Sequence, residues 1–274
     1  MRFGLALGGG GLKGAAHLGV LIVLEENNIK PDIVVGTSAG SIAAALYGAG
    51  LLPVVSTMES LPFANIFRLE NYRLTGLPLG LIQGGTIEGM LKKALGSRHL
   101  SELSPLTAAV ACDLMSGETV IYTSARPVKP LPPDMAMGGD VPAWQAVRAS
   151  ISIPALFAPY KIGSRLLVDG GLTDNVPADI ASYLGADVVI AVDLDCRVVT
   201  NRAFRHAGEV LVQSLDIISR RNTTLALKLY ADLVLKPIKK PVSFWDFGEF
   251  GTLVAAGAEE ARRNLPQIRR LLGR

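Results

Sequence analysis

Two glycine-rich loops near the start of this chain constrain its fold more than any other feature. One loop spans residues 8–14 and follows the apolar run 3–7; the other spans 36–40 and follows the apolar run 33–36. Segments with helical spacing come directly after them, at 15–25 and 41–48. Two strands separated by a helix predict a right-handed βαβ unit with parallel strands. Both loops then lie at the carboxyl ends of adjacent strands, where open α/β sheets bind their ligands.

The second loop reads Gly36-Thr37-Ser38-Ala39-Gly40, which predicts a nucleophile elbow. In such an elbow a serine stands at the apex of a sharp turn between a strand and a helix. The flanking glycines allow strand and helix to approach closely, and the helix N-terminus at Ser38 favours negative charge. Because glycine-rich chains contain this pentapeptide by chance, its place after a strand carries the argument. We therefore predict Ser38 as the nucleophile of a serine hydrolase.

A serine nucleophile needs a base, and the three histidines are poorly placed for that role. His17 and His206 fall inside helical patterns, and His99 falls in an irregular segment. None of them follows a strand, so a Ser-His-Asp triad remains only an alternative.

Asp169 is the better candidate for the base. It follows a short apolar strand at 166–168 and precedes Gly170 and Gly171, which let the backbone bring a carboxylate close to another group. We predict that the Asp169 carboxylate takes the proton of Ser38 and returns it to the leaving alcohol. The alternative is that Asp169 only caps a turn.

The first loop offers a string of backbone N–H donors that can hold a developing oxyanion. The same residues also fit a dinucleotide-binding fingerprint, Gly9-x-Gly11-x-x-Gly14 after a strand. That fingerprint requires an acidic residue at the end of the second strand, where this chain has Gly36-Thr37-Ser38 instead. A dinucleotide-binding module therefore remains only a rival to the hydrolase, and a non-enzymatic regulator that keeps the fold but lacks turnover is a third class.

The composition fits one large or two small α/β domains. Of 274 residues, 49% are hydrophobic and 29 are glycine. The net charge of +3 comes without a dense run of Lys and Arg, which argues against a nucleic-acid partner. Cys112 and Cys196 lie in apolar runs and are interpreted as core thiols. No set of Cys and His residues suggests a metal, so we expect no metal and no cofactor.

No segment near the N-terminus has the pattern of a secretory signal, so a cytoplasmic location is expected, with peripheral membrane contact left open. Residues 33–58 contain no charge and are long enough to span a bilayer. Their glycines and Pro53 predict a buried strand, turn and helix instead.

The rest of the chain continues as a mixture of strands and helices. Residues 51–100 form either a lid over the site or helical padding, and 127–142 is a proline-rich exposed loop. The patterns predict a hairpin at 108–113 and 119–123, helices at 143–150, 176–184, 204–222 and 252–272, and strands at 187–192 and 231–235.

Two surface features also have two readings. The arginines of the last helix either contact anionic lipid headgroups or form a solvated face; they are Arg262, Arg263, Arg269 and Arg270. The aromatic residues Phe244, Trp245 and Phe247 either line an interfacial surface or pack in the core.

The order and spacing of these motifs resemble the patatin-like phospholipase family over nearly the whole chain, most closely the compact bacterial members, which are similar to the catalytic domain of neuropathy target esterase. The matching segments are Gly9-Gly10-Gly11-Leu12-Lys13-Gly14, Gly36-Thr37-Ser38-Ala39-Gly40, Asp169-Gly170-Gly171, Arg148-Ala149-Ser150-Ile151-Ser152-Ile153-Pro154, Asp174-Asn175-Val176-Pro177, residues 232–237 and the helix around Gly257. Lys13 stands where the family often has arginine, and Gly171 where many members have alanine.

The resemblance implies a single domain over 1–274, with a three-layer α/β/α fold and a mostly parallel central sheet. It implies a Ser38–Asp169 dyad that hydrolyses carboxylic esters of phospholipids or lysophospholipids. The oxyanion donors would be amides of Gly9, Gly10, Gly11 and Leu12. Supporting or substrate-binding positions would be Lys13, Gly14, Gly36, Gly40, Gly170 and Gly171. Lys13 has a structural role, contacts phosphate or pairs with an acidic residue, and acyl transfer on the same dyad remains an alternative to hydrolysis.

Overall fold

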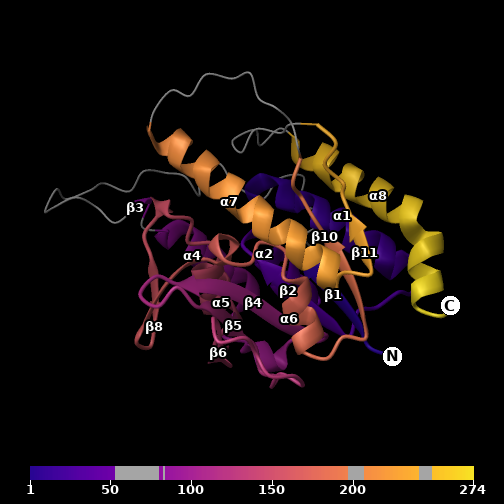
Figure 1. The fold of residues 1–274 in the computed structure, drawn as a ribbon, viewed down its shortest axis with the longest axis horizontal. Helices are drawn as coiled ribbons and strands as arrows, with labels where there is room; N and C mark the ends of the chain where they lie inside the picture. The colour runs from indigo at the N-terminus through magenta and orange to yellow at the C-terminus, as the bar shows by residue number, and fades with distance from the viewer. Residues whose placement is uncertain (53–79, 83, 197–206, 241–248) are drawn as a thin grey trace, which may run out of the picture.

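A mostly parallel sheet forms the middle layer of the molecule (Figure 1). The computed structural model describes residues 1–52, 80–82, 84–196, 207–240 and 249–274. The strand order is β11-β10-β1-β2-β4-β5-β6. The first five are parallel: β11 (Leu233–Leu235), β10 (Val188–Val192), β1 (Phe3–Leu7), β2 (Ile33–Thr37) and β4 (Leu106–Asp113). Strand β5 (Thr119–Tyr122) returns antiparallel to β4, as the predicted hairpin requires.

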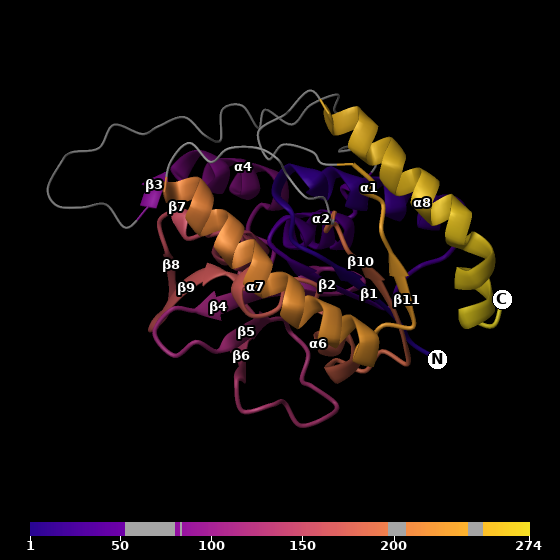
Figure 2. The same ribbon diagram turned by 45° about the horizontal axis from the view of Figure 1, so that its top comes forward.

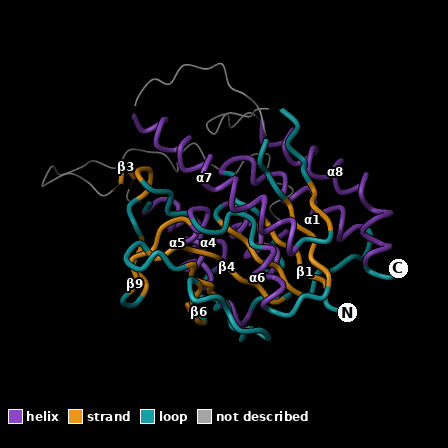
Figure 3. The backbone as a smooth tube through the Cα atoms, viewed as in Figure 1, coloured by secondary structure: helices purple, strands orange, loops and turns teal. Residues whose placement is uncertain are grey.

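Helices cover both faces of the sheet, which gives the three layers seen in Figure 3. Successive strand residues point to opposite faces, so Leu5 and Leu7 enter one apolar core and Ala6 enters the other. The core of Leu5 is completed by α1 (Ala15–Glu26), α2 (Ala39–Gly48), α4 (Gly85–Leu95), α5 (Ala143–Ser150) and α8 (Phe250–Leu271). The core of Ala6 is completed by α6 (Ala178–Tyr183) and α7 (Ala207–Tyr230). The predicted α/β/α class is confirmed.

Strand β4 is longer than its neighbour β2, and this extra length organises the site. Its residues up to Val110 pair with β2, while Ala111–Asp113 pair with β9 (Arg165–Asp169). Residues 109–112 of β4 pair with β5 on the other side. Strand β9 must therefore occupy the same side of β4 as β2, beyond the point where β2 ends. A second antiparallel strand, β8 (Tyr160–Ile162), borders β9.

The proline-rich segment 127–142 is not entirely a loop, contrary to the sequence prediction. Residues Met135–Gly139 form β6, which pairs in parallel with β5 at the edge of the sheet. The strand requires a glycine at 138, because a Cβ there would lie 2.5 Å from the ring of Tyr122 on β5. Local turn signals miss such tertiary pairing.

Several predicted helices have different ends in the structure. The helix predicted at 176–184 begins only at Ala178, because Pro177 has a non-helical ψ of 59° and caps the helix. The helix predicted at 204–222 continues to Tyr230; its first three residues, 204–206, lie outside the described residues. The aromatic residues 244–247 also lie outside them.

The predicted lid or padding at 51–100 is described only in part. Residues 53–79 and 83 lie outside the described residues. The remainder includes α4, the 3-10 turn η3 (Leu100–Glu102) and the short strand β3 (Gly80–Ile82), which pairs in parallel with β7 (Ala155–Phe157). The uncharged stretch that starts at residue 33 forms strand β2 and helix α2, as predicted, and residues 53–58 of it are not described. None of the helices in the described ranges has the length and hydropathy of a membrane span.

Candidate active site

Ser38 stands at a sharp turn between β2 and α2. Its backbone has φ 52° and ψ −121°, an uncommon conformation for a residue with a side chain, and such a conformation costs on the order of 1–3 kcal/mol. The turn also depends on two glycines. A Cβ at Gly36 would collide with the carbonyl of Gly40, and a Cβ at Gly40 would collide with the carbonyl of Leu7. The strand, turn and helix predicted for this loop are all present.

Asp169 reaches Ser38 through the shared pairing with β4. Thr37 pairs with Val110, and Asp169 pairs with Ala111, the next residue along β4. The end of β2 and the end of β9 therefore meet head to head beside one strand. Residues 131 positions apart in the chain are brought into contact in this way.

The two side chains form a short hydrogen bond in a buried place. The Ser38 hydroxyl donates to Oδ2 of Asp169 at 2.6 Å, and Oδ1 of Asp169 accepts from the N–H of Gly171 at 2.8 Å. Ser38 is 6% exposed and Asp169 is 7% exposed. Burial raises the pKa of Asp169 to about 6, although the hydrogen bonds from Ser38 and Gly171 oppose that shift. Near neutral pH the carboxyl group is thus ionised and basic enough to accept a proton.

The first glycine loop lies beside this pair, but one predicted donor is already engaged. The N–H of Gly9 donates to the carbonyl of Asn175 at 2.9 Å, so Gly9 is not an oxyanion donor in this structure. The 3-10 turn η1 (Gly11–Gly14) begins after it, and its first internal bond runs from the Lys13 N–H to the Gly10 carbonyl. The first amides of such a turn lack partners within it. Gly10, Gly11 and Leu12 therefore supply the candidate donors.

Asn175 is a site residue to which the sequence analysis assigned no role. Its side-chain Oδ1 lies between the first glycine loop and the turn at Gly170 and Gly171. A Cβ at Gly9 would come within 2.5 Å of this oxygen, and a Cβ at Gly171 within 3.1 Å. Its backbone carbonyl holds Gly9, and the neighbouring Asp174 carbonyl accepts from the Thr37 hydroxyl at 2.9 Å. The signal for this residue was present in the segment 174–177.

Ser150 is the second such residue. Its Oγ accepts from the backbone N–H of Ser38 at 2.9 Å and donates to the carbonyl of Val110. Ser152, two residues on, accepts from the backbone N–H of Asp169 at 2.9 Å through its own carbonyl. The segment 148–154 resembled the family motif, but its function could not be assigned without the pairing of β4.

Neither of the two described histidines enters this arrangement. His17 is buried and its Nε2 contacts the carbonyl of Gly8 at 2.7 Å, while burial lowers its pKa to about 4. His99 is partly exposed and caps η3, with Nδ1 3.7 Å from Asp140. His206 lies outside the described residues.

Two of the predicted supporting positions, Gly14 and Gly170, have packing roles. A Cβ at Gly14 would lie 2.5 Å from Cβ of Ala39, so this glycine lets η1 approach α2. A Cβ at Gly170 would collide with the Val110 carbonyl. Lys13 forms no ion pair with any described residue, which leaves its acidic-partner reading without support there. No three His, Cys, Asp or Glu side chains in the described ranges are placed to hold a metal ion.

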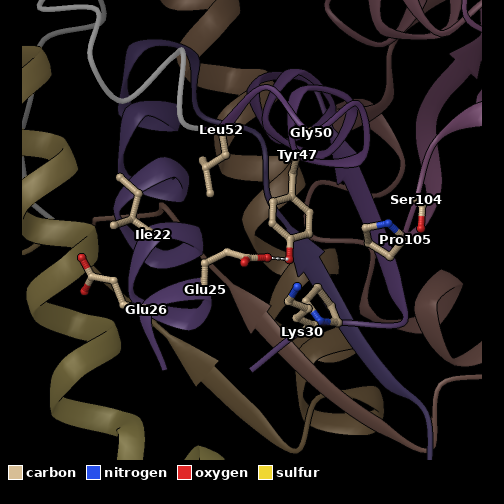
Figure 4. Close-up of a pocket in the computed structure, with 10 residues that line it drawn as sticks. Ile22, Glu25, Glu26, Lys30, Tyr47, Gly50, Leu52, Ser104 and Pro105 are labelled. Carbon is tan, nitrogen blue, oxygen red and sulfur yellow. Dashed lines mark hydrogen bonds between the residues drawn. The ribbon is translucent and has the colours of Figure 1, made fainter. Parts of the chain in front are cut away.

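A cavity of about 560 Å³ lies near the amino ends of β2 and β4, at the end of the sheet opposite Ser38 (Figure 4). It is lined at the C-terminal ends of α1 and α2, near Lys30 and Pro105, just before the starts of β2 and β4. Glu25 accepts a hydrogen bond from the Tyr47 hydroxyl in it, as Figure 4 shows. Ser38 follows the opposite end of β2, so this cavity does not belong to the Ser38 site.

Comparison with known proteins adds family information to this geometry. A family model described as patatin-like phospholipase matches residues 5–182. An uncharacterized NTE family protein of Mycobacterium tuberculosis is 31% identical over 195 residues, which cover 71% of this chain and 49% of that protein. Lysophospholipase NTE1 of Coccidioides immitis is 31% identical over 195 residues, which cover 70% of this chain and 11% of that protein. The chain spans about half the length, or less, of these curated relatives.

A solved structure shares the fold. VipD from Legionella pneumophila superposes with a TM-score of 0.59 at 16% identity, covering 97% of this chain and 67% of that one. At this identity the likeness concerns the fold alone.

Proposed function

The chain belongs to the patatin-like phospholipase family, and from this premise we propose that it is a serine hydrolase that cleaves carboxylic ester bonds of lipids. Family membership supports a lipid hydrolase. The proposal that Ser38 and Asp169 form the catalytic pair rests on one observation. This is the 2.6 Å hydrogen bond between Ser38 Oγ and Asp169 Oδ2 at the strained turn.

In the proposed reaction, Ser38 Oγ attacks the ester carbonyl while its proton passes to Oδ2 of Asp169. The carbonyl oxygen becomes an oxyanion, which the amides of Gly10, Gly11 and Leu12 stabilise; each such donor contributes about 3 kcal/mol in comparable hydrolases. The proton then moves from Asp169 to the leaving alcohol, and an acyl-serine remains. Water, activated by the same carboxylate, attacks the acyl group and releases the fatty acid and Ser38.

The surroundings of Asp169 favour these proton transfers. A carboxylate with the ordinary pKa of an aspartate is a weak base, and burial moves the pKa to about 6, closer to neutral pH. The Gly171 N–H fixes Oδ1, which leaves Oδ2 directed at the serine. Phospholipids and lysophospholipids are the proposed substrates, because the matched family is named for phospholipases and the relative from Coccidioides immitis is a lysophospholipase.

A fluorophosphonate probe tests the proposal directly. We expect it to label the wild-type protein but not Ser38→Ala, and we expect Ser38→Ala to lose hydrolysis of a short p-nitrophenyl ester and of lysophosphatidylcholine. Ser101→Ala is the control, since that hydroxyl is exposed and donates to Asp140 on the surface. Equal labelling of Ser38→Ala and wild type, or a wild-type protein that neither labels nor releases fatty acid, overturns the proposal.

A further inference from the structure

We propose that Ser150 is a positioning residue that holds the strained backbone of Ser38 in its reactive conformation; this inference rests on the proposed function. The gap between the end of β2 and the end of β9 lies beside Val110 and Ala111. A strand ladder interrupted at this point leaves a backbone donor and a backbone acceptor facing each other without a direct bond. The Ser150 hydroxyl fills that gap.

The partners of the Ser150 hydroxyl fix which of its two hydrogen bonds it accepts and which it donates. The Ser38 N–H donates to Ser150 Oγ at 2.9 Å, and the Ser150 hydroxyl proton goes to the Val110 carbonyl. Ser150 is fully buried, and the polar atoms it joins are backbone groups of buried residues. Without the hydroxyl, the Ser38 amide and the Val110 carbonyl both lose a partner, and a buried unpaired group costs about 1–3 kcal/mol.

The same short segment also holds the other half of the pair. The carbonyl of Ser152 accepts the backbone N–H of Asp169, and the Ser152 hydroxyl accepts from Nη1 of Arg148 at 2.7 Å. Ser150 and Ser152 thus tie the backbones of nucleophile and base to one segment at the end of α5. The distance between Ser38 Oγ and Asp169 Oδ2 depends on this shared anchor.

The test compares Ser150→Ala with Thr107→Val. Thr107 also has a buried hydroxyl on a carbonyl, that of Pro105 at 2.9 Å, but it lies at the opposite end of β4. A purely structural role predicts similar losses of stability and no change in turnover for both variants. A positioning role predicts that only Ser150→Ala loses kcat on a short p-nitrophenyl ester, by about 10- to 100-fold with little change in KM, since a small misplacement of a reacting group costs this much.

Two further measurements keep the inference independent of turnover. Amide hydrogen exchange over residues 36–41 should rise in Ser150→Ala and not in Thr107→Val, and Ser150→Thr, which keeps the hydroxyl, should restore slow exchange and most of the kcat. Unchanged exchange and kcat in folded Ser150→Ala overturn the inference. If the wild-type protein has no esterase activity, the proposed function fails, while the exchange measurement still decides the role of Ser150.

A different observation carries a second inference, on the outer face of α7. Figure 2 shows this helix crossing the molecule in front of α6, and it packs against α6 and the 3-10 turn η4 (Gly170–Leu172). Five large aliphatic side chains on it are between 47% and 68% exposed: Val210, Ile217, Ile218, Leu225 and Leu229. At 100° per residue these positions share an arc of about 120°, so they form one outward stripe.

We infer that this stripe docks on an anionic phospholipid surface. Arg221 and Lys228 lie within the same arc and are exposed, and none of the described exposed positions of α7 carries an acidic side chain. A helix with an apolar stripe and basic residues beside it lies in the interface of a membrane. Because α7 packs against η4, which directly follows Asp169, a lipid surface on the outer face of α7 would lie one helix away from the base of the proposed dyad.

Vesicle sedimentation tests this docking without requiring turnover, so its failure is distinct from failure of the hydrolase proposal. Two basic side chains near an anionic surface contribute a factor of about 30 in binding. Binding of Arg221→Gln/Lys228→Gln to phosphatidylglycerol vesicles should therefore fall by about that factor. Arg262→Gln/Arg270→Gln on α8 removes the same charge from another surface and should bind like the wild type.

The apolar contribution has its own matched pair. Ile217→Ser/Ile218→Ser should weaken binding to the same vesicles, whereas Leu114→Ser/Met115→Ser, which alters exposed residues of the β4–β5 turn, should not. Turnover of a short soluble ester should stay unchanged in all four variants. Undiminished vesicle binding by both α7 variants overturns the inference. A second outcome also overturns the inference. If the wild type is a dimer in gel filtration, and Ile217→Ser/Ile218→Ser dissociates it without weakening vesicle binding, a second copy covers the stripe.

Discussion

The Ser38 site and the outer face of α7 depart in opposite ways from the usual distribution of side chains. In the site, polar residues are buried: Ser38 and Asp169 are less than 8% exposed, and Ser150 is fully buried. On α7, large aliphatic residues are exposed, with Leu229 at 68%. Either departure has a free-energy cost in an isolated folded chain.

The two regions offset this free-energy cost in different ways. In the site, backbone groups and neighbouring hydroxyls supply partners for the buried polar atoms, so the structure itself compensates. On α7 none of the described residues covers the aliphatic stripe, and in our proposal a lipid surface compensates for its exposure. The first region is thus expected to be rigid and intolerant of substitution, and the second tolerant of it.

The largest expected effect is on turnover in the buried region. Asp169→Asn keeps the shape of the side chain but removes the base, and kcat/KM for a short ester should fall by about 10³-fold or more. Asp140→Asn, a partly exposed carboxylate that caps Ser101, should leave kcat/KM unchanged. Retention of wild-type turnover by Asp169→Asn would remove the proposed base.

A backbone contact of the site predicts a large effect on stability. Gly40→Ala places a Cβ against the Leu7 carbonyl, so the free energy of unfolding should fall by about 3 kcal/mol. Gly89→Ala, in α4 with open space around it, should instead gain up to about 1 kcal/mol from helix propensity. Urea unfolding measures both, and equal effects would contradict the close packing at the elbow.

The raised pKa of Asp169 predicts a pH dependence of stability. Since the pKa is about 6 in the folded state and 3.8 ordinarily, the folded state holds the proton more tightly. The resulting stabilisation is complete below about pH 4 and is lost as the pH rises through 6, a loss of up to about 3 kcal/mol. Relative to the wild type, Asp169→Asn should become more stable over this range. Parallel unfolding curves of the two proteins against pH would refute the shift.

The same titration predicts the pH profile of turnover. The proton-accepting form of Asp169 is the carboxylate, so kcat/KM should rise about tenfold per pH unit below 6 and level off above it. His17, with a pKa of about 4, should not contribute, and His17→Gln should keep the same midpoint if the protein folds. A midpoint that moves with His17→Gln would revive the triad.

The smallest expected effect belongs to the exposed region. Ile217→Ser should change the free energy of unfolding by less than about 0.5 kcal/mol, because the residue is already 58% exposed. Ile33→Ser, in a fully buried strand position, should lose several kcal/mol in the same urea assay. A large loss from Ile217→Ser would show that the stripe packs against the chain itself.

Strong local patterns made most of the elements predictable. Apolar runs bounded by glycine located β1 and β2, and helical spacing located α1 and α8 within one to two residues. The edge strand β6 was missed because its residues are proline-flanked and glycine-rich, and only pairing with β5 makes them a strand. Within the site, the free Gly9 amide was expected wrongly, since its acceptor on Asn175 lies 166 residues away.

Three local units could be predicted from the sequence: a strand that ends in a glycine loop, a serine at a turn, and an aspartate after a short strand. These local units depend on neighbours within a few residues, whose spacing and backbone preferences can be recognised in the amino-acid sequence. The contact of β2 and β9 with the same stretch of β4, and the position of Ser150 between them, became visible only in the folded structure. Strand pairing between distant segments decides such contacts, and no local preference specifies which strands will pair.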